Sequence, residues 1–256
     1  WAANSSDIKN AFCQSRKTNR SQPIAASLPP GMLEAGFDLD PRQLLLCETE
    51  VYGLISGPSW LRQTLVDEFE NMGYIRNMYD KCIKTLPSSN KSVCNDGFVV
   101  IEVDDLLESG NDRHRVNMAK FYRKFKCGKN KRLIDLGTQG TLTGGIRVIQ
   151  HPYFSFTWSM KEYIDTMKPI DVPRGFISQT EELDEAHMSE VVSSNGKIGW
   201  VGGNGRPDIA AGHSIIAGQY RDKSIALITQ CNSCVKQAKK QDVVMRVWSI
   251  PPQILR

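Results

Sequence analysis

The stretch from Gly97 to Gly110, GFVVIEVDDLLESG, limits the fold more than any other part of the chain. Its apolar and β-branched residues predict a buried strand, and Asp104 and Asp105 follow where that strand should end. Adjacent carboxylates repel each other, and burial disfavours their charged form. Two explanations are open. Either the strand reaches the surface and both carboxylates are solvated, or they hold a divalent cation together with a ligand elsewhere in the chain.

Length and composition are typical of a globular protein with one large domain or two small ones. The 256 residues are 40% hydrophobic and 23% charged, and no apolar run of about 18 residues predicts a membrane span, so we expect no membrane partner. The N-terminus lacks the pattern of a signal peptide and an initiator Met, which we interpret as a fragment or processed product.

The seven cysteines are scattered and odd in number, which favours reduced thiols and a cytoplasmic or nuclear location. The pair Cys231 and Cys234 in CNSC has no second CxxC and no nearby histidine. It therefore lacks the four ligands of a structural zinc site.

Periodic patterns predict an α+β part followed by a helical part. Leu61, Leu65, Phe69 and Met72 recur at helical spacing within residues 60–73, and residues 144–159 predict a β-hairpin. Beyond Pro169 the pattern is mostly helical, over 178–192, 206–220 and 222–240. We therefore expect one domain over residues 1–169 and a second over 170–256.

A basic segment follows the paired aspartates. Residues 113–132 contain nine Lys and Arg side chains and no acidic one, interleaved with Phe121, Tyr122 and Phe125. Such a segment can neutralise phosphates while aromatic rings stack on bases. It can equally be an amphipathic helix with a solvated cationic face and buried rings. The candidate nucleic-acid contacts are Arg113, Arg115, Lys120, Arg123, Lys124 and Lys126.

The third carboxylate is found in DIKNAF, where Asp7 opens a predicted strand and Phe12 follows five residues later. In sequence order, DIKNAF, SLPPG (27–31), VYGLISGPSW (51–60), EVDD (102–105) and GRPDIAAGHSIIA (205–217) resemble motifs of the reverse transcriptase of copia-type retrotransposons. The resemblance covers nearly the whole chain. It implies a right-hand polymerase palm with an antiparallel sheet, followed by a mostly helical thumb or connection region.

The resemblance implies roles for particular residues. Asp7, Asp104 and Asp105 would hold two Mg²⁺ ions, with Mn²⁺ as a possible substitute, for transfer of deoxynucleoside triphosphates to a primer on an RNA or DNA template. Phe12 would exclude a ribose 2′-hydroxyl, or alternatively be an ordinary core residue. The expected nucleotide floor consists of Tyr52, Gly53, Ser56 and Pro58. An intact element would act within a virus-like particle.

Several positions depart from the family pattern. Glu102 replaces the tyrosine before Val-Asp-Asp; facing the primer phosphates it would repel them, and facing away it would be harmless. Ser56 and Gly57 replace the usual Gln and Ala. The N-terminal part of the fingers and an RNase H domain are expected to be missing. The alternatives are therefore a truncated, inactive relic that at most binds nucleic acid, or an unrelated Mg²⁺ phosphotransferase.

Overall fold

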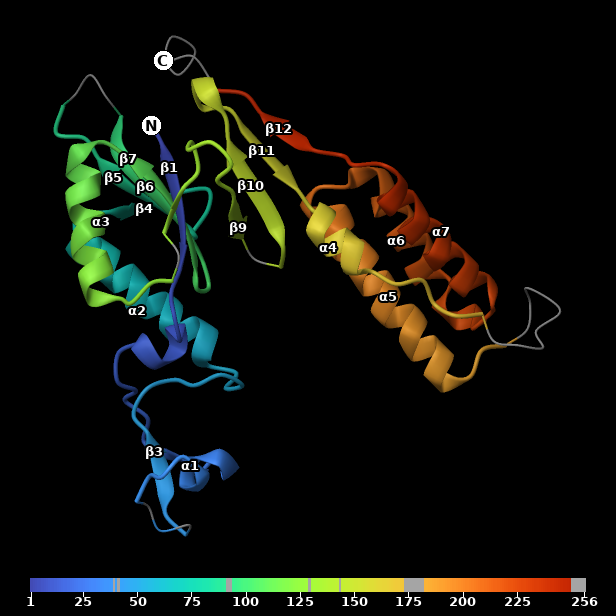
Figure 1. Cartoon of the computed structure of the whole chain (residues 1–256), viewed down its shortest axis with the longest axis horizontal. Helices are drawn as coiled ribbons and strands as arrows, with labels where there is room; N and C mark the ends of the chain where they lie inside the picture. Colours follow the sequence, from blue (N-terminus) through green and yellow to red (C-terminus); the bar gives the residue numbers. More distant parts are fainter. Residues whose placement is uncertain are drawn as a thin grey trace. The chain divides into compact units, whose positions relative to one another are not determined.

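The computed structural model describes residues 1–38, 40, 42–90, 94–128, 130–142, 144–172 and 182–249 (Figure 1). The chain forms two compact units. The first consists of Trp1 and Ala3–Asn130, and the second of Ala2 and Lys131–Arg256. Both the mixture of helices and strands and the antiparallel pairing agree with the expected α+β class.

The first unit is built on an antiparallel sheet in which the strands follow the order β4-β5-β6-β7-β1. Its strands are β1 (Ala3–Asp7), β2 (Ile24–Ser27), β3 (Leu44–Cys47), β4 (Ile75–Arg76), β5 (Ile83–Pro87), β6 (Asn95–Glu102) and β7 (Asp105–Gly110). Strands β2 and β3 pair separately with each other. The helices are η1 (Ala11–Gln14, 3-10), α1 (Pro30–Glu34), α2 (Gly57–Asn71) and α3 (Asp112–Lys124).

Helices α2 and α3 cover one face of this sheet and form the hydrophobic core with it. The expected apolar stripe of α2 is buried, because Leu61, Leu65 and Phe69 are each 0% exposed. They belong to one cluster with Phe121 of α3 and with residues from β5, β6 and β7. Asn111 caps α3 by accepting hydrogen bonds from the amides of Arg113 and His114.

The second unit combines a small sheet with a helical bundle. The sheet has the strand order β12-β11-β10-β9. The strands of this unit are β8 (Lys131–Arg132), which is not part of that sheet, β9 (Gly140–Leu142), β10 (Ile146–Gln150), β11 (Phe156–Ser159) and β12 (Met245–Val247). Its helices are η2 (Pro152–Phe154, 3-10), α4 (Lys161–Thr166), α5 (Glu185–Asn204), α6 (Pro207–Gly218), η3 (Tyr220–Asp222, 3-10) and α7 (Ala226–Lys240). The predicted hairpin is confirmed as β10–β11, and two of the three predicted helices as α6 and α7. The third corresponds to α5, and residues 178–181 of its predicted range lie outside the described residues.

Two sequence predictions differ from the structure. Asp7 ends strand β1 instead of opening one, because pairing with β7 stops there and the chain turns at Asn10 (φ 47°) into η1. The units divide after Asn130 and not after residue 169. The physical reason is that β11 pairs with the C-terminal strand β12, which ties residues 140–159 to the helical part.

Candidate functional site

Two of the three predicted catalytic aspartates lie directly opposite each other. Asp7, the last residue of β1, is the register partner of Asp105, the first residue of β7. Directly opposite residues of antiparallel strands have Cβ atoms about 4.5–5.5 Å apart on one face of the sheet. Asp104 lies in the preceding turn, and its carbonyl accepts a 2.8 Å hydrogen bond from the amide of Ile8. The backbone therefore brings all three aspartates to one end of the sheet.

The opposing pair lies on the sheet face that α2 and α3 leave uncovered. Side chains alternate between faces along a strand. Glu108 of β7 contacts His114 of α3, and Leu106 belongs to the helix-packed core, so Asp105 points to the other face. The same alternation in β1 places Ser6, which contacts Tyr122 of α3, on the helical face and Asp7 on the opposite face.

Glu102 joins this row of carboxylates. It is the register partner of Asp105 in the β6–β7 pair, so Glu102, Asp105 and Asp7 occupy one row across three strands. Glu102, which was expected to repel primer phosphates only if it faces them, therefore lies on the same face of the sheet as Asp7 and Asp105. The turn between Glu102 and Asp105 contains Val103 at φ 55°, a strained conformation for a β-branched residue.

The row consists of oxygen donors, which is the donor type that Mg²⁺ prefers. No Lys, Arg or His side chain of the described residues forms an ion pair with Asp7, Glu102 or Asp104. Within those same residues, no three His, Cys, Asp or Glu side chains are gathered into a group that could hold a metal ion. The donor chemistry fits a divalent cation, and the two-ion site stays a prediction.

The segment that follows α3 runs back alongside Asp7. The amide of Gly128 donates a 2.7 Å hydrogen bond to the carbonyl of Asp7, and the amide of Lys9 bonds the carbonyl of Lys126 at 2.9 Å. A Cβ atom at position 128 would lie 2.6 Å from Oδ2 of Asp7, so this contact requires glycine. Burial, followed by the negative charge of Asp7, raises the pKa of the Cys127 thiol to about 11.

Two residues beside the aspartates were missed by sequence reasoning. Lys9 is exposed two residues after Asp7. Gln14 holds the two segments together, because its side-chain amide bonds the carbonyl of Lys9, while its Nε2 and Oε1 pair with the carbonyl and amide of Lys126 at 2.9 and 2.7 Å. Gln14 therefore joins the backbone at Lys9, two residues after Asp7, to the backbone at Lys126. No local sequence signal marks this contact, because it joins segments more than 100 residues apart.

The structure brings part of the predicted nucleotide floor together. The ring of Phe12 lies edge-on to that of Tyr52, with centroids 4.7 Å apart. A Cβ at Gly57 would touch the Phe12 ring at 3.4 Å. Phe12 is 9% exposed and belongs to the core cluster, whereas Tyr52 is 59% exposed. Phe12 therefore packs as a core residue, which is one of its two expected roles. Its role in sugar selection remains a prediction.

The other floor residues have local structural roles. Gly53 has φ 94°, a backbone conformation that favours glycine in the turn before α2. Pro58 lies in the first turn of α2. The hydroxyl of Ser56 donates to the buried carboxylate of Glu50 at 3.1 Å and accepts from Arg20 at 2.6 Å. Because these partners occupy Ser56, its hydroxyl is not free to contact a substrate in this conformation.

The six predicted nucleic-acid contacts fall into two groups. Arg113 pairs with Asp96 at 2.9 Å, Arg115 pairs with Asp112, and Lys124 pairs with Glu68. In the described part of the chain, the side chains of Lys120, Arg123 and Lys126 form no ion pair. Helix α3 covers the face opposite the carboxylate row, whereas Lys126 lies beyond the helix, in the segment whose backbone bonds Lys9 and Asp7.

Two of the three aromatic residues of the basic segment, Phe121 and Phe125, are not available for stacking on bases. Phe121 and Phe125 are 0% and 3% exposed, and their rings stack on each other with centroids 4.7 Å apart. Phe121 also stacks on Phe69 of α2 at 4.8 Å. The amphipathic-helix interpretation is therefore confirmed for these rings.

A buried polar network ties strands β1 and β7 to α3 on the helical face. The Glu108 carboxylate accepts hydrogen bonds from Asn4 of β1 and from His114 Nε2, each at 2.6 Å. The hydroxyl of Tyr74 lies 2.8 Å from His114 Nδ1. Burial is the main cause that raises the pKa of Tyr74. His114 is packed against Gly97 and Gly110, where a Cβ would approach the imidazole to 2.5 Å.

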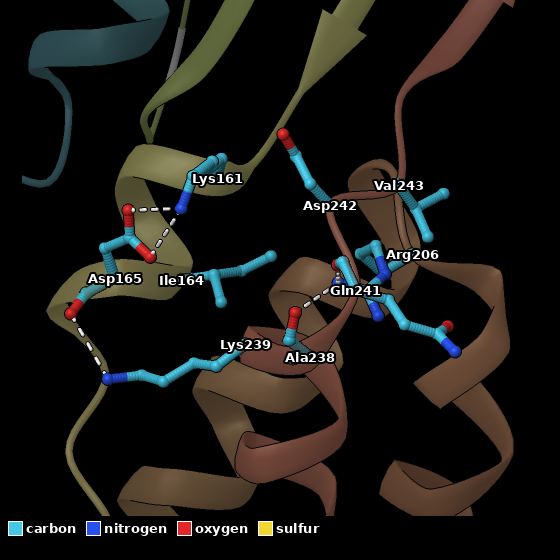
Figure 2. A pocket seen from close by; sticks show the side chains of 9 residues that line it. All are labelled: Lys161, Ile164, Asp165, Arg206, Ala238, Lys239, Gln241, Asp242 and Val243. Carbon is cyan, nitrogen blue, oxygen red and sulfur yellow. Dashed lines mark hydrogen bonds and ion pairs between the residues drawn. The ribbon is translucent and has the colours of Figure 1, made fainter.

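The Arg-Pro-Asp motif has a structural explanation. The side chain of Arg206 is buried, pairs with both carboxylate oxygens of Asp208 at 2.8 Å, and donates to the carbonyls of Ala238 and Gln241 at 2.6 and 2.9 Å. It thereby satisfies carbonyls that the end of α7 leaves unpaired. Figure 2 shows the residues that line a small pocket beside it, where Lys161 pairs with Asp165. We interpret this motif as a clamp on α7.

No family model and no curated protein matches the chain. Membership of the copia-type family is therefore a proposal that rests on the motifs and on the geometry above. The described part of the chain contains no helix long and apolar enough to cross a membrane.

Proposed function

We propose that this chain is the reverse transcriptase domain of a copia-type retroelement, an RNA-directed DNA polymerase that extends a primer on an RNA or DNA template. The observation that carries the proposal is the pairing of Asp7 with Asp105, with Asp104 in the adjoining turn, on the sheet face opposite α2 and α3. Helices behind the sheet and carboxylates in front of it fit a polymerase palm.

Each residue near the row has a distinct task in this proposal. Asp7, Asp104 and Asp105 hold the divalent cations, and Mg²⁺, or Mn²⁺ in its place, supplies when bound the positive charge that stabilises the attacking and leaving oxygens. Lys9 and Lys126 bind phosphates at the edge of the row. Phe12, fixed between Tyr52 and Gly57, presents a rigid ring to the sugar of a deoxynucleoside triphosphate.

The proposal is tested by primer extension on poly(rA)·oligo(dT) with dTTP and Mg²⁺ or Mn²⁺, together with calorimetric titration of Mn²⁺. We expect Asp105→Asn to abolish extension and to weaken cation binding at least tenfold. Glu190→Gln, on the exposed surface of α5, is the matched control and should leave both unchanged. Cation binding that is equal in Asp105→Asn and Glu190→Gln would exclude a metal site at this row.

Sugar selection provides a separate test in an active enzyme. Phe12→Val removes ring volume, so kcat/KM for ribonucleotides should rise relative to that for deoxyribonucleotides. A core residue without this role predicts a loss of stability of about 3 kcal/mol with unchanged discrimination. Unchanged discrimination in a folded, active Phe12→Val protein would end the gate hypothesis.

A second candidate function, an inactive retroelement remnant that binds nucleic acid, is favoured by Glu102. Its carboxylate shares the row with Asp105 and Asp7, where it adds negative charge close to the expected primer phosphates. If this charge blocks catalysis, Glu102→Gln should allow extension that the original chain does not perform. Absence of extension in both proteins, with Mn²⁺ binding retained, would favour the remnant.

A further inference from the structure

The tip of the second unit's sheet exposes an aromatic surface that the polymerase proposal does not use. Figure 1 shows β10, β11 and β12 side by side. At the end where η2 joins β10 to β11, Tyr153 is 88% exposed and Phe154 46% exposed; Trp248, after β12, is 66% exposed. In the antiparallel pair of β11 and β12, Phe156 lies opposite Val247, so continuing the same register by one residue places Trp248 beside Ser155. Tyr153, Phe154, Trp248 and Arg246 are called the aromatic tip below.

The backbone holds Tyr153 in an unfavourable conformation. Tyr153 and Phe154 have φ values of 64° and 60°, in the left-handed region that residues other than glycine rarely adopt. Hydrogen bonds close the loop on both sides, from the His151 amide to the Ser155 carbonyl at 2.8 Å and from the Phe154 amide to the His151 carbonyl at 3.1 Å. The strained loop is thus fixed, and it presents a large ring to solvent.

A cation is held beside these rings. The guanidinium of Arg246 lies 3.9 Å from the centroid of Trp248 and bonds the hydroxyl of Ser155 at 3.4 Å. No Asp or Glu occurs in residues 140–160 or 243–249, whereas Arg147, His151 and Arg246 do. A surface with exposed rings, a fixed guanidinium and no nearby carboxylate on its own strands complements a chain of bases and phosphates.

We propose that the aromatic tip binds single-stranded nucleic acid by stacking bases on Trp248 and Tyr153 while Arg246 contacts a phosphate. Stacking on aromatic side chains tolerates any sequence, because every base has a π face. The tip shows no group placed to read a 2′-hydroxyl, so RNA and DNA of equal length should bind alike. Duplex should bind this site poorly, because its bases are already stacked. The proposal is independent of catalysis at the aspartates.

The test measures fluorescence anisotropy of fluorescein-labelled dT12 and U12 with the whole chain at low salt. We expect Trp248→Leu to weaken binding of both probes about fivefold or more. Tyr153→Asn should do the same, and it also relieves the left-handed strain, so its effect cannot come from a damaged loop. Tyr79→Leu, which removes a 90% exposed ring from a turn in the first unit, is the control and should have no effect.

Several outcomes would overturn the proposal. The first is that neither probe binds at micromolar protein, and the second is that Trp248→Leu and Tyr79→Leu bind the probes with equal affinity. The third is a concentration-dependent dimer in sedimentation that Trp248→Leu abolishes, which would assign the tip to contact between copies of the chain. Separate variants distinguish this inference from the polymerase proposal. Loss of primer extension in Asp105→Asn bears on the aspartates alone, whereas loss of dT12 affinity in Trp248→Leu bears on the aromatic tip alone.

Discussion

Removal of the Glu108 carboxylate should destabilise the first unit strongly. Glu108 is 3% exposed and accepts hydrogen bonds from Asn4 Nδ2 and His114 Nε2. Glu108→Leu leaves both donors without that acceptor in a site from which water is excluded. A buried group left unpaired costs about 1–3 kcal/mol, and two donors with short hydrogen bonds lose their acceptor here. We therefore expect a loss of about 3–5 kcal/mol in the free energy of unfolding.

A double-mutant cycle identifies the cause. If the cost comes from the orphaned imidazole, Glu108→Leu combined with His114→Leu should cost at least about 1 kcal/mol less than the sum of the two single changes. A cost caused only by altered shape would be additive.

The assay has to separate the two units, because their unfolding need not be one transition. Native-state hydrogen exchange of peptides from β6 and β7 reports the opening of the first unit alone. Glu190→Leu, on exposed α5, is the control and should leave this exchange unchanged. Protection of β6 and β7 that is as strong in Glu108→Leu as in the control would refute the reasoning.

Three further predictions concern glycines and an ion pair. Gly128→Ala should displace the Asp7 carboxylate and abolish primer extension. The free energy of unfolding should fall by less than about 1.5 kcal/mol, because the new methyl meets the movable end of a side chain. Primer extension at the original rate would contradict this prediction. Gly97→Ala should cost at least about 3 kcal/mol in urea unfolding because its methyl meets a buried imidazole, whereas Gly196→Ala, with open space around it, should be neutral or stabilising. Hydrogen bonds from Arg206 hold the pKa of Asp208 below the ordinary value of an aspartate. Its contribution to stability is therefore fully present above the unfolded-state pKa of about 4 and is lost as pH falls through the folded-state pKa. Asp208→Asn should flatten that part of the pH profile of the second unit, as followed by circular dichroism.

The sequence by itself determined the regular elements near the site. Strand β6 was predictable because its apolar run is bounded by glycines and ends at charged residues, and α2 because its buried leucines recur at helical spacing. The α7 helix and the β10–β11 hairpin were predictable for similar local reasons. Such features depend on residues close together in the chain, and their periodicity is visible without knowledge of the fold.

Tertiary structure alone decided which residues meet. The pairing of Asp7 with Asp105 depends on register between strands about 100 residues apart, and one residue of slip would move either side chain to the other face. The same register placed Glu102 in the row. It also separated most of the basic segment from the carboxylates, because α3 packs behind the sheet.

Burial also decided between interpretations that the composition of the sequence left open. The rings of Phe121 and Phe125 alternate with basic residues, and only packing against α2 shows that they are core residues. Arg206 looked like part of a motif and proved to be a clamp on distant carbonyls. Sequence patterns record what each residue prefers locally, whereas contact, register and solvent exposure arise only when distant segments pack together, and these decide the chemistry of a site.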